Sequence, residues 1–200
     1  MIKHARELIL EKTFLLLLEK GYERISVSDI QKSLGMSRGL LYRYFKNKDE
    51  LVESACRSFF VDRFILSEDE MKKLSFFDSL VHMHNALISL LDELEKKYGK
   101  VISVLQYNML YADVIMHSEA FKITAYTEFS KAREIVEKAK ARGEIRKEFS
   151  TQFILNVTFD ILDRVSSAIR AEDEIRRQIL SDVREFYDSI KVIKTAKALS

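Results

Sequence analysis

Residues 26–48 read SVSDIQKSLGMSRGLLYRYFKNK and contain two helix starts separated by a single glycine. Ser26 stands three residues before Asp29, the spacing at which a hydroxyl and a carboxylate cap the first turn of a helix. Gly35 is a typical residue for a helix end, and Ser37 behind it is a second N-cap residue. The stretch therefore predicts two short helices joined by a tight turn.

The first helix is expected to run to about Leu34, and the second to span residues 38–45. Helical spacing divides their side chains into an inward apolar set and an outward, mainly polar set. The inward set is Ile30, Leu34, Met36, Leu41 and Phe45. The outward set is Ser37, Arg38, Gly39, Tyr42, Arg43 and Tyr44. This pattern predicts a short second helix with one apolar side packed on the protein and one polar side exposed to solvent.

The outward set has the chemistry of a contact with duplex DNA. Arg38, at the start of the second helix, can bind guanine O6 and N7 together, and the two tyrosines can bind phosphates or pack on thymine methyl groups. Gly39 allows close approach of the backbone, and Lys46 and Lys48 lie where phosphate neutralisation is expected. An ordinary helical hairpin is the alternative, and it leaves two exposed tyrosines on a basic surface unexplained.

Charge is unevenly distributed along the chain. Residues 1–50 carry ten Lys or Arg against seven Asp or Glu, and the remainder carries 23 against 24. Within residues 30–48 there are five basic residues and no acidic one. This local cluster indicates a polyanionic partner at one place, with a solvated basic surface as the alternative on charge alone.

The composition predicts an all-helical globular protein. Of the 200 residues, 47% are hydrophobic and 32% are charged, with five glycines and no proline. No apolar run reaches the roughly 18 residues that a membrane span needs, and the N-terminus lacks a signal-peptide core, so we expect a cytoplasmic protein. The single cysteine, Cys56, is expected to be a small core residue.

Other helices follow from apolar periodicity and from glycine or serine boundaries. We expect them over residues 3–20, from residue 49 onward, and over 75–98, 100–116, 118–142, 150–171 and 173–197, about nine helices in all. Ser67 and Glu70 have the spacing of a further capping box. The predicted domains are a DNA-binding domain over residues 1–48 and a helical body over residues 49–200, with the boundary inside the helix that starts near residue 49.

The run from Gly21 to Leu51 resembles the N-terminal domain of TetR-family transcriptional regulators. The shared features are a Gly-Tyr pair, a capped second helix, Gly-x-Ser, Leu-Tyr-x-x-Phe and a Lys-Asn-Lys-x-x-Leu ending. Leu40 departs from the family pattern, which often has a small Thr or Ser at this position that can touch DNA.

The resemblance implies an all-α homodimer with a three-helix helix-turn-helix head and a larger helical body for ligand binding and dimerisation. Such a protein is a ligand-responsive regulator, most often a repressor released from a pseudo-palindromic operator by a small, largely apolar molecule. By position, the DNA-contacting residues are Ser26, Val27, Ser28, Ser37, Arg38, Gly39, Tyr42, Arg43, Tyr44 and Lys48. Activation remains open, as does a DNA binder of the nucleoid-organising type that is regulated by a protein partner.

The last two helices carry apolar residues at helical spacing, as expected for a four-helix bundle formed with a second copy. The predicted interface residues are Phe153, Val157, Ile161, Val165, Ile169, Ile179, Val183, Phe186 and Ile190. Packing of both stripes within one subunit is the alternative.

An unusual density of aromatic and thioether side chains between residues 98 and 129 suits an apolar ligand. The candidate ligand residues are Tyr107, Met109, Tyr111, Met116, Phe121, Tyr126 and Phe129, together with Asn156 and Asp160. A plain core is the alternative for the aromatic set. For Asn156, Asp160 and Asp163, which share one helix face, surface ion pairs are the alternative.

The remaining residues offer little catalytic chemistry. His82 and His84 are two residues apart and point to different sides of one helix, so we expect no metal site. No phosphate loop, nucleophile elbow or paired-carboxylate motif is present in the sequence. We therefore expect neither an enzyme nor a cofactor, and the predicted partners are duplex DNA, an unidentified small effector and a second copy of the chain, with no membrane contact.

Overall fold

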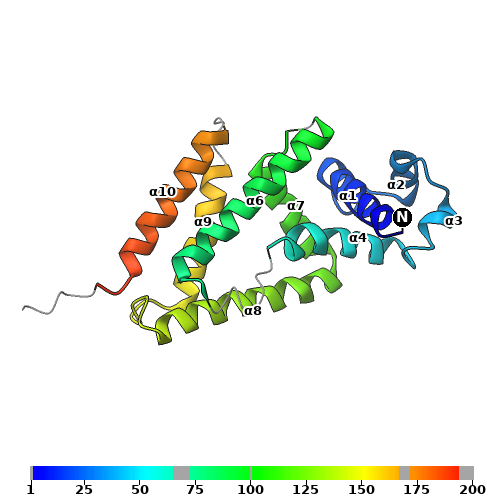
Figure 1. Ribbon diagram of the computed structural model, residues 1–200. Coiled ribbons are helices and arrows are strands. Elements are labelled where there is room, and N and C mark those ends of the chain that lie inside the picture. The colour runs from blue at the N-terminus through cyan, green and yellow to red at the C-terminus, as the bar shows by residue number, and fades with distance from the viewer. Residues whose placement is uncertain (1, 65–72, 100, 167–171, 194–200) are drawn as a thin grey trace, which may run out of the picture. The chain divides into compact units, whose positions relative to one another are not determined.

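The computed structural model describes residues 2–64, 73–99, 101–166 and 172–193. Within these ranges the regular elements are helices, accompanied by one isolated bridge between Ile145 and Lys191 (Figure 1). The elements are α1 (Ile2–Lys20), α2 (Val27–Leu34), α3 (Arg38–Leu41), α4 (Lys48–Arg57), the π-helical η1 (Ser58–Asp62), α6 (Phe76–Tyr98), α7 (Val104–His117), α8 (Glu119–Ala141), α9 (Thr151–Ser166) and α10 (Glu172–Ile190). The predicted all-α class is confirmed.

The contacts group the described helices into two compact units. The first consists of Met1–Ile65 and Val101–Glu128, and the second of Leu66–Lys100 and Phe129–Ser200. The first unit holds α7 as well as α1 to α4, because α7 packs against α1. The units thus do not follow the division at residues 48 and 49, and a DNA-binding domain over 1–48 with a body over 49–200 stays a prediction about function.

Aromatic rings form the centre of the first unit. The ring of Phe14 on α1 stacks on that of Phe59 in η1, with 4.4 Å between the centroids. Phe60 meets the rings of Tyr107 and Phe121 at 4.7 and 5.8 Å. The Tyr107 hydroxyl donates a hydrogen bond of 2.7 Å to the carbonyl of Phe59, so the π-helical turn is tied to α7 by a buried polar contact.

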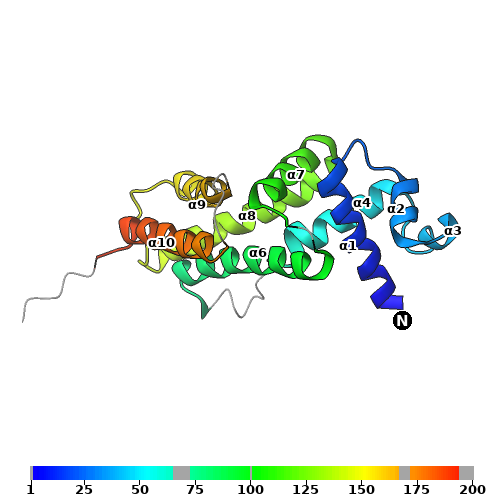
Figure 2. The same cartoon turned by 90° about the horizontal axis from the view of Figure 1, so that it is seen from above.

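The same unit carries the predicted helix-turn-helix. Helix α2 packs against α1 and α3, and Figures 1 and 2 show α2 and α3 side by side. Regular α-helix ends at Leu41, earlier than the predicted residue 45. Residues 42–45 nevertheless continue in hydrogen-bonded turns, with the N–H of Phe45 bonded to the Leu41 carbonyl at 3.3 Å. The predicted second helix is therefore present as one regular turn followed by irregular turns.

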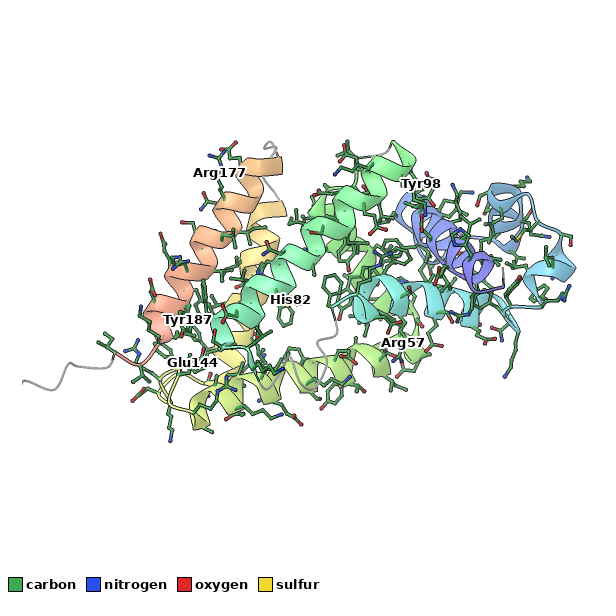
Figure 3. The ribbon with its side chains drawn as sticks, viewed as in Figure 1. Arg57, His82, Tyr98, Glu144, Arg177 and Tyr187 are labelled. Carbon is green, nitrogen blue, oxygen red and sulfur yellow. The ribbon has the colours of Figure 1, made fainter. Side chains whose placement is uncertain are left out.

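The second unit is built on α6, with α10 packed against both α6 and α9. Ile179, Val183 and Ile190 of α10 are almost completely buried. Tyr187 of α10 lies beside Glu144, with 3.4 Å between the hydroxyl and a carboxylate oxygen (Figure 3). The backbone N–H of Phe76, at the start of α6, donates to the same carboxylate. Glu144 thus connects the start of α6 to the end of α10.

Two helix boundaries differ from prediction for local reasons. Helix α7 begins at Val104 and not at residue 100, because the Ser103 side chain accepts from the N–H of Gln106 at 3.1 Å and caps a later start. Helix α10 ends at Ile190 and not at residue 197, because the following residues pair with residues 144–146. Residues 67–70, 167–171 and 194–197, on which other predictions fall, lie outside the described residues.

Candidate nucleic-acid interface

The start of α2 is fixed by a reciprocal cap. The Ser26 side chain accepts from the backbone N–H of Asp29 at 3.1 Å, and the Asp29 carboxylate accepts from the N–H of Ser26 at 3.0 Å. Lys20, at the end of α1, contacts the same carboxylate at 2.6 Å. The hydrogen bond from Lys20, followed by those from Ser26, holds the pKa of Asp29 far below its usual range. The predicted capping box is present, and α1 is tied to it.

The turn between α2 and α3 needs its glycine. Gly35 lies in the left-handed region at φ 62°, where other residues are strained, and its N–H closes α2 on the Lys32 carbonyl. Met36 follows with its N–H bonded to the Gln31 carbonyl at 3.2 Å. Ser37 then caps α3 by accepting from the N–H of Leu40 at 3.3 Å. The chain reverses within three residues, as a helix-turn-helix requires.

The base of α3 is buried in the first unit. Ile30, Leu41 and Phe45 are at most 2% exposed. Leu34 and Met36, the other two members of the predicted inward set, are half-buried. The buried Leu41 of α3 and Phe45 just after it show which side of this helix faces the interior, and Ile30 is buried on the neighbouring α2.

The predicted outward set faces solvent almost as a whole. Ser37, Arg38, Gly39, Tyr42 and Arg43 are exposed, and Tyr44 is half-buried. The Arg38 guanidinium lies over the Tyr42 ring, 5.5 Å from its centroid. Cation–π contact of this kind limits the positions available to the arginine head before any partner binds. The structure therefore places Arg38, the predicted base reader, against the ring of Tyr42, a predicted phosphate contact, on the exposed side of α3.

The residues predicted to contact phosphate differ in their exposure and in the contacts that hold them. At the start of α2, Ser26 and Ser28 are exposed and Val27 is half-buried. Lys46 is exposed, and its backbone N–H donates at 2.6 Å to Glu50 in the cap of α4. Lys48 is half-buried, with its ammonium group 5.9 Å from the centroid of the Tyr22 ring. Lys48 is therefore partly held by the connector between α1 and α2.

One basic residue near α3 was missed by sequence reasoning. The guanidinium of Arg6, on α1, lies 5.2 Å from the centroid of the Phe45 ring, at the end of the helix-turn-helix. Arg6 is exposed and adds a positive charge beside the predicted DNA-contacting set. No local sequence signal marks it, because its place depends on how α1 packs against the two short helices.

Residues 9–55 match the family model of bacterial regulatory proteins of the tetR family. The chain is 25% identical over 165 residues to the HTH-type transcriptional regulator UidR of Escherichia coli K12, over 79% of this chain and 78% of that protein. It is 22% identical over 125 residues to IcaR, the negative regulator of the icaADBC biofilm operon of Staphylococcus epidermidis, over 58% and 68%. The fold matches a TetR-family regulator from Marinobacter aquaeolei VT8 with a TM-score of 0.67 and 15% identity, over 96% of this chain and all of that one.

The chain belongs to the TetR family of transcriptional regulators. Regulators of this family are DNA-binding proteins without enzymatic activity, and they are generally dimers. This TetR-family regulator is therefore a DNA-binding protein and not an enzyme. None of its described helices is both long and apolar enough to cross a membrane.

The predicted ligand set of this regulator divides between interior and surface. Tyr107 and Phe121 belong to the aromatic centre of the first unit, where Tyr111 meets Phe121 at 5.8 Å. Met109, Met116 and Tyr126 are 63–75% exposed. Phe129, in the second unit, stacks on Phe159 at 6.0 Å. The ligand-binding role of this set stays a prediction.

The polar members of the ligand set lie on the surface of α9. Asn156 and Asp160 are both exposed, and the Asn156 side chain accepts from Gln152 at 2.8 Å. A buried site for a cation does not form around them. Asp163 lies among residues whose side chains are not described.

The predicted dimer stripe on α10 is covered within one chain. Ile179, Val183, Phe186 and Ile190 are at most 8% exposed, and Ile161 of α9 is 6% exposed. Val157 is half-buried and Phe153 is 46% exposed. The side chains of Val165 and Ile169 lie outside the described set. For the α10 stripe, the alternative of packing within one subunit fits the burial, and the interface residues on α9 stay a prediction.

One polar group in the second unit has no partner in the structure. His84 on α6 is 1% exposed, and its Nδ1 lies 2.5 Å from the Leu80 carbonyl. Its Nε2 is buried without a hydrogen bond. Burial lowers the pKa of the ring, so it is neutral, and Nδ1 carries the proton given to Leu80. Nε2 is therefore an unused acceptor, which sequence reasoning about His84 missed.

Proposed function

We propose that this regulator is a repressor that binds a pseudo-palindromic operator as a homodimer and is released by a small, largely apolar effector. DNA binding is supported by the exposed side chains of α3, which lie over the buried Ile30, Leu41 and Phe45. The curated relative IcaR is a negative regulator, which favours repression.

Helix α3 is the reader in this proposal. Its N-terminal end enters the major groove, where Arg38 binds a guanine, while α2 crosses the phosphate backbone through Ser26 and Ser28. Tyr42 and Lys46 bind phosphate and fix the position of α3 on the duplex without reading sequence. The basic cluster supplies affinity, and Arg38 supplies discrimination.

The homodimer is expected from the two-fold symmetry of a pseudo-palindrome. Because the α10 stripe is buried, the exposed apolar side chains that could form an interface in this part of the described chain include Phe153 and Phe159 on α9 and Leu180 on α10, which are 37–46% exposed. Light scattering measures the state directly. A monomer at micromolar concentration would contradict the dimer.

The effector is proposed to bind in the helical body. His84 supports this part, because a neutral, buried imidazole with an unused Nε2 acceptor suits an apolar molecule that carries one hydroxyl or N–H donor. An unmatched buried acceptor costs about 1–3 kcal/mol, and a ligand donor would recover it.

A protein partner is the second candidate. Leu105, Met109 and Met116 on α7, with Ile123 and Tyr126 on α8, are 45–75% exposed. Exposed apolar side chains that gather into one contiguous patch are typical of protein-contact sites. Such a regulator would bind its operator tightly and respond to no small compound.

One set of measurements tests the proposal. Duplexes selected by the wild-type protein from a random library should contain an inverted repeat.

The effector is tested by thermal-shift screening with phenols and alcohols. Compounds that bind should raise the melting temperature of the wild type more than that of His84→Leu, and they should release the selected duplex. His82→Leu, at an exposed position on the same helix, is the control. Selection without an inverted repeat would contradict the operator, and a screen without any hit would favour the protein partner.

A further inference from the structure

The connector between α1 and α2 is held from outside the helix-turn-helix by α7. The backbone N–H of Tyr22 donates a hydrogen bond of 2.8 Å to Oδ2 of Asp113. Gly21 precedes it at φ 77°, and a Cβ there would stand 3.1 Å from the same oxygen. The glycine therefore allows the Asp113 carboxylate to approach the connector backbone.

His117, one turn further along α7, extends this contact. Its Nδ1 lies 2.8 Å from the Asp113 carbonyl and 3.0 Å from Oδ1 of the same residue. Its Nε2 lies 3.5 Å from a carboxylate oxygen of Glu23 in the connector. The imidazole also stacks on the Tyr22 ring, with 6.0 Å between centroids. Asp113 thus contacts the backbone of the connector at Tyr22, and His117 contacts the Tyr22 ring and the Glu23 carboxylate.

Both nitrogens of His117 face acceptors. A neutral imidazole can donate from only one nitrogen, whereas the protonated ring donates from both and carries the charge that two carboxylates favour. The hydrogen bond to the Asp113 carbonyl, followed by the charges of Glu23 and Asp113, raises the pKa of His117 above 6.5. Protonation of His117 and closure of the contact with Glu23 therefore favour each other.

The other groups around this contact come from α4 and from the residue after α7. Lys48 of α4 has its ammonium group 5.9 Å from the Tyr22 ring, and Asp49 acts on the Tyr22 hydroxyl through its charge. Ser118 forms a hydrogen bond with the Tyr22 side chain. These groups face Tyr22, while the charges that face His117 are Asp113 and Glu23.

We propose that Asp113 and His117 form a pH-sensitive clasp that positions the DNA-binding helices through the connector at Tyr22. They are positioning residues and do not touch DNA themselves. The inference rests on the proposed function, because it assigns the clasp to operator binding.

The clasp acts on two groups of the predicted interface. The connector leads directly into the Ser26 cap of α2, so holding Tyr22 fixes the start of α2. Lys48, which is predicted to bind phosphate, rests against the Tyr22 ring. Ordering these groups before DNA arrives lowers the entropy cost of binding. A closed clasp therefore strengthens operator binding.

The direction of the pH effect follows from the raised pKa. Because the pKa of His117 is raised in the closed form, His117 stabilises the closed clasp fully below its unperturbed pKa of 6.5. This stabilisation is lost as the pH rises through the raised pKa. Operator affinity should thus be highest near pH 6 and should fall severalfold toward pH 8.5 at constant ionic strength.

The first test needs no DNA. Selective ¹⁵N-tyrosine labelling of the full chain gives one backbone amide signal for each of its eight tyrosines, and Tyr22→Phe assigns the signal of interest. The Tyr22 amide should titrate with the same midpoint as the His117 ring. A Tyr22 amide that does not follow the His117 titration would overturn the clasp.

The second test compares operator affinity at pH 6 and pH 8.5, on a duplex selected from a random library by the wild-type protein. His117→Gln should bind weakly at both pH values, and His117→Arg, which keeps a charged donor, should bind tightly at both. His82→Gln, on α6, should retain the wild-type pH dependence. The salt dependence should be the same in all four proteins, because His117 makes no phosphate contact.

The outcomes separate this inference from the proposed function. If no duplex is selected by the wild type, the proposed function fails, while the amide titration still tests the clasp. If the Tyr22 amide titrates but His117→Gln keeps the wild-type pH dependence of affinity, the clasp does not position the head and the inference is wrong. A reduced salt dependence in His117→Gln would also contradict it, because His117 would then be a phosphate contact.

Discussion

The backbone N–H of Tyr22 donates a hydrogen bond to the carboxylate of Asp113, 91 residues further along the chain, at 2.8 Å. Tyr22 follows Gly21, whose own N–H closes α1 on the Leu17 carbonyl at 2.8 Å. The end of α1 and the last turns of α7 therefore form one local structure. Within the first unit, this contact ties the helix-turn-helix to a segment that lies far from it in sequence.

Replacement of Gly21 should be more harmful than replacement of Gly35. Both glycines have positive φ, so alanine at either position costs about 1–2 kcal/mol of backbone strain. At Gly21 the new Cβ would also stand 3.1 Å from Asp113, whereas nothing lies within 4 Å at Gly35. Urea unfolding should show a larger loss of free energy for Gly21→Ala. Equal losses would mean that Asp113 moves away without cost.

The cap of α2 should make stability depend on pH. Because the pKa of Asp29 is lowered in the folded protein from its ordinary value of 3.8, its contribution is present above about pH 4 and is lost as the pH falls. The stability difference between the wild type and Asp29→Asn should therefore be larger at pH 7 than at pH 3. Lys20→Gln should remove part of that dependence, because Lys20 is the largest cause of the shift.

Two substitutions at Tyr42 separate its hydroxyl from its ring. Tyr42→Phe keeps the ring under Arg38 but removes the hydroxyl, so it should weaken specific and non-specific DNA binding alike. Tyr42→Ala removes both and should also reduce preference at the base that Arg38 reads. Competition binding with selected and random duplexes measures both effects. A selective loss of specific binding in Tyr42→Phe would refute the phosphate role.

The two helix starts and the end of α2 in the helix-turn-helix could be predicted because they depend on neighbouring residues. Ser26 and Ser37 cap the helices that follow them, and Gly35 adopts the left-handed conformation that ends α2. The buried and exposed sides of α3 also followed from spacing, since the buried Leu41 and Phe45 lie one helical turn apart. Local chemistry was sufficient for these features.

Features that depend on distant contacts could not be predicted. Periodicity in α10 indicated one buried face, but it did not say whether α6 and α9 or a second subunit would cover it. The aromatic stretch from Tyr107 to Phe129 has the composition of a binding site, yet most of its rings fill the centre of the first unit, Phe129 meets α9, and Tyr126 is exposed. The approach of Asp113 to Tyr22 leaves no pattern in either segment.

The central claim is that α3 reads DNA sequence through Arg38, and a selection experiment with matched variants tests it most directly. Arg24 is also exposed, but its guanidinium bonds the Lys20 carbonyl at 2.9 Å, so Arg24→Ala is the control. Binding to the full set of single-base variants of the selected operator should show that Arg38→Ala loses about 1–3 kcal/mol and relaxes preference at one position in each half-site. Unchanged base preference in Arg38→Ala, with the same loss for every duplex, would contradict the account.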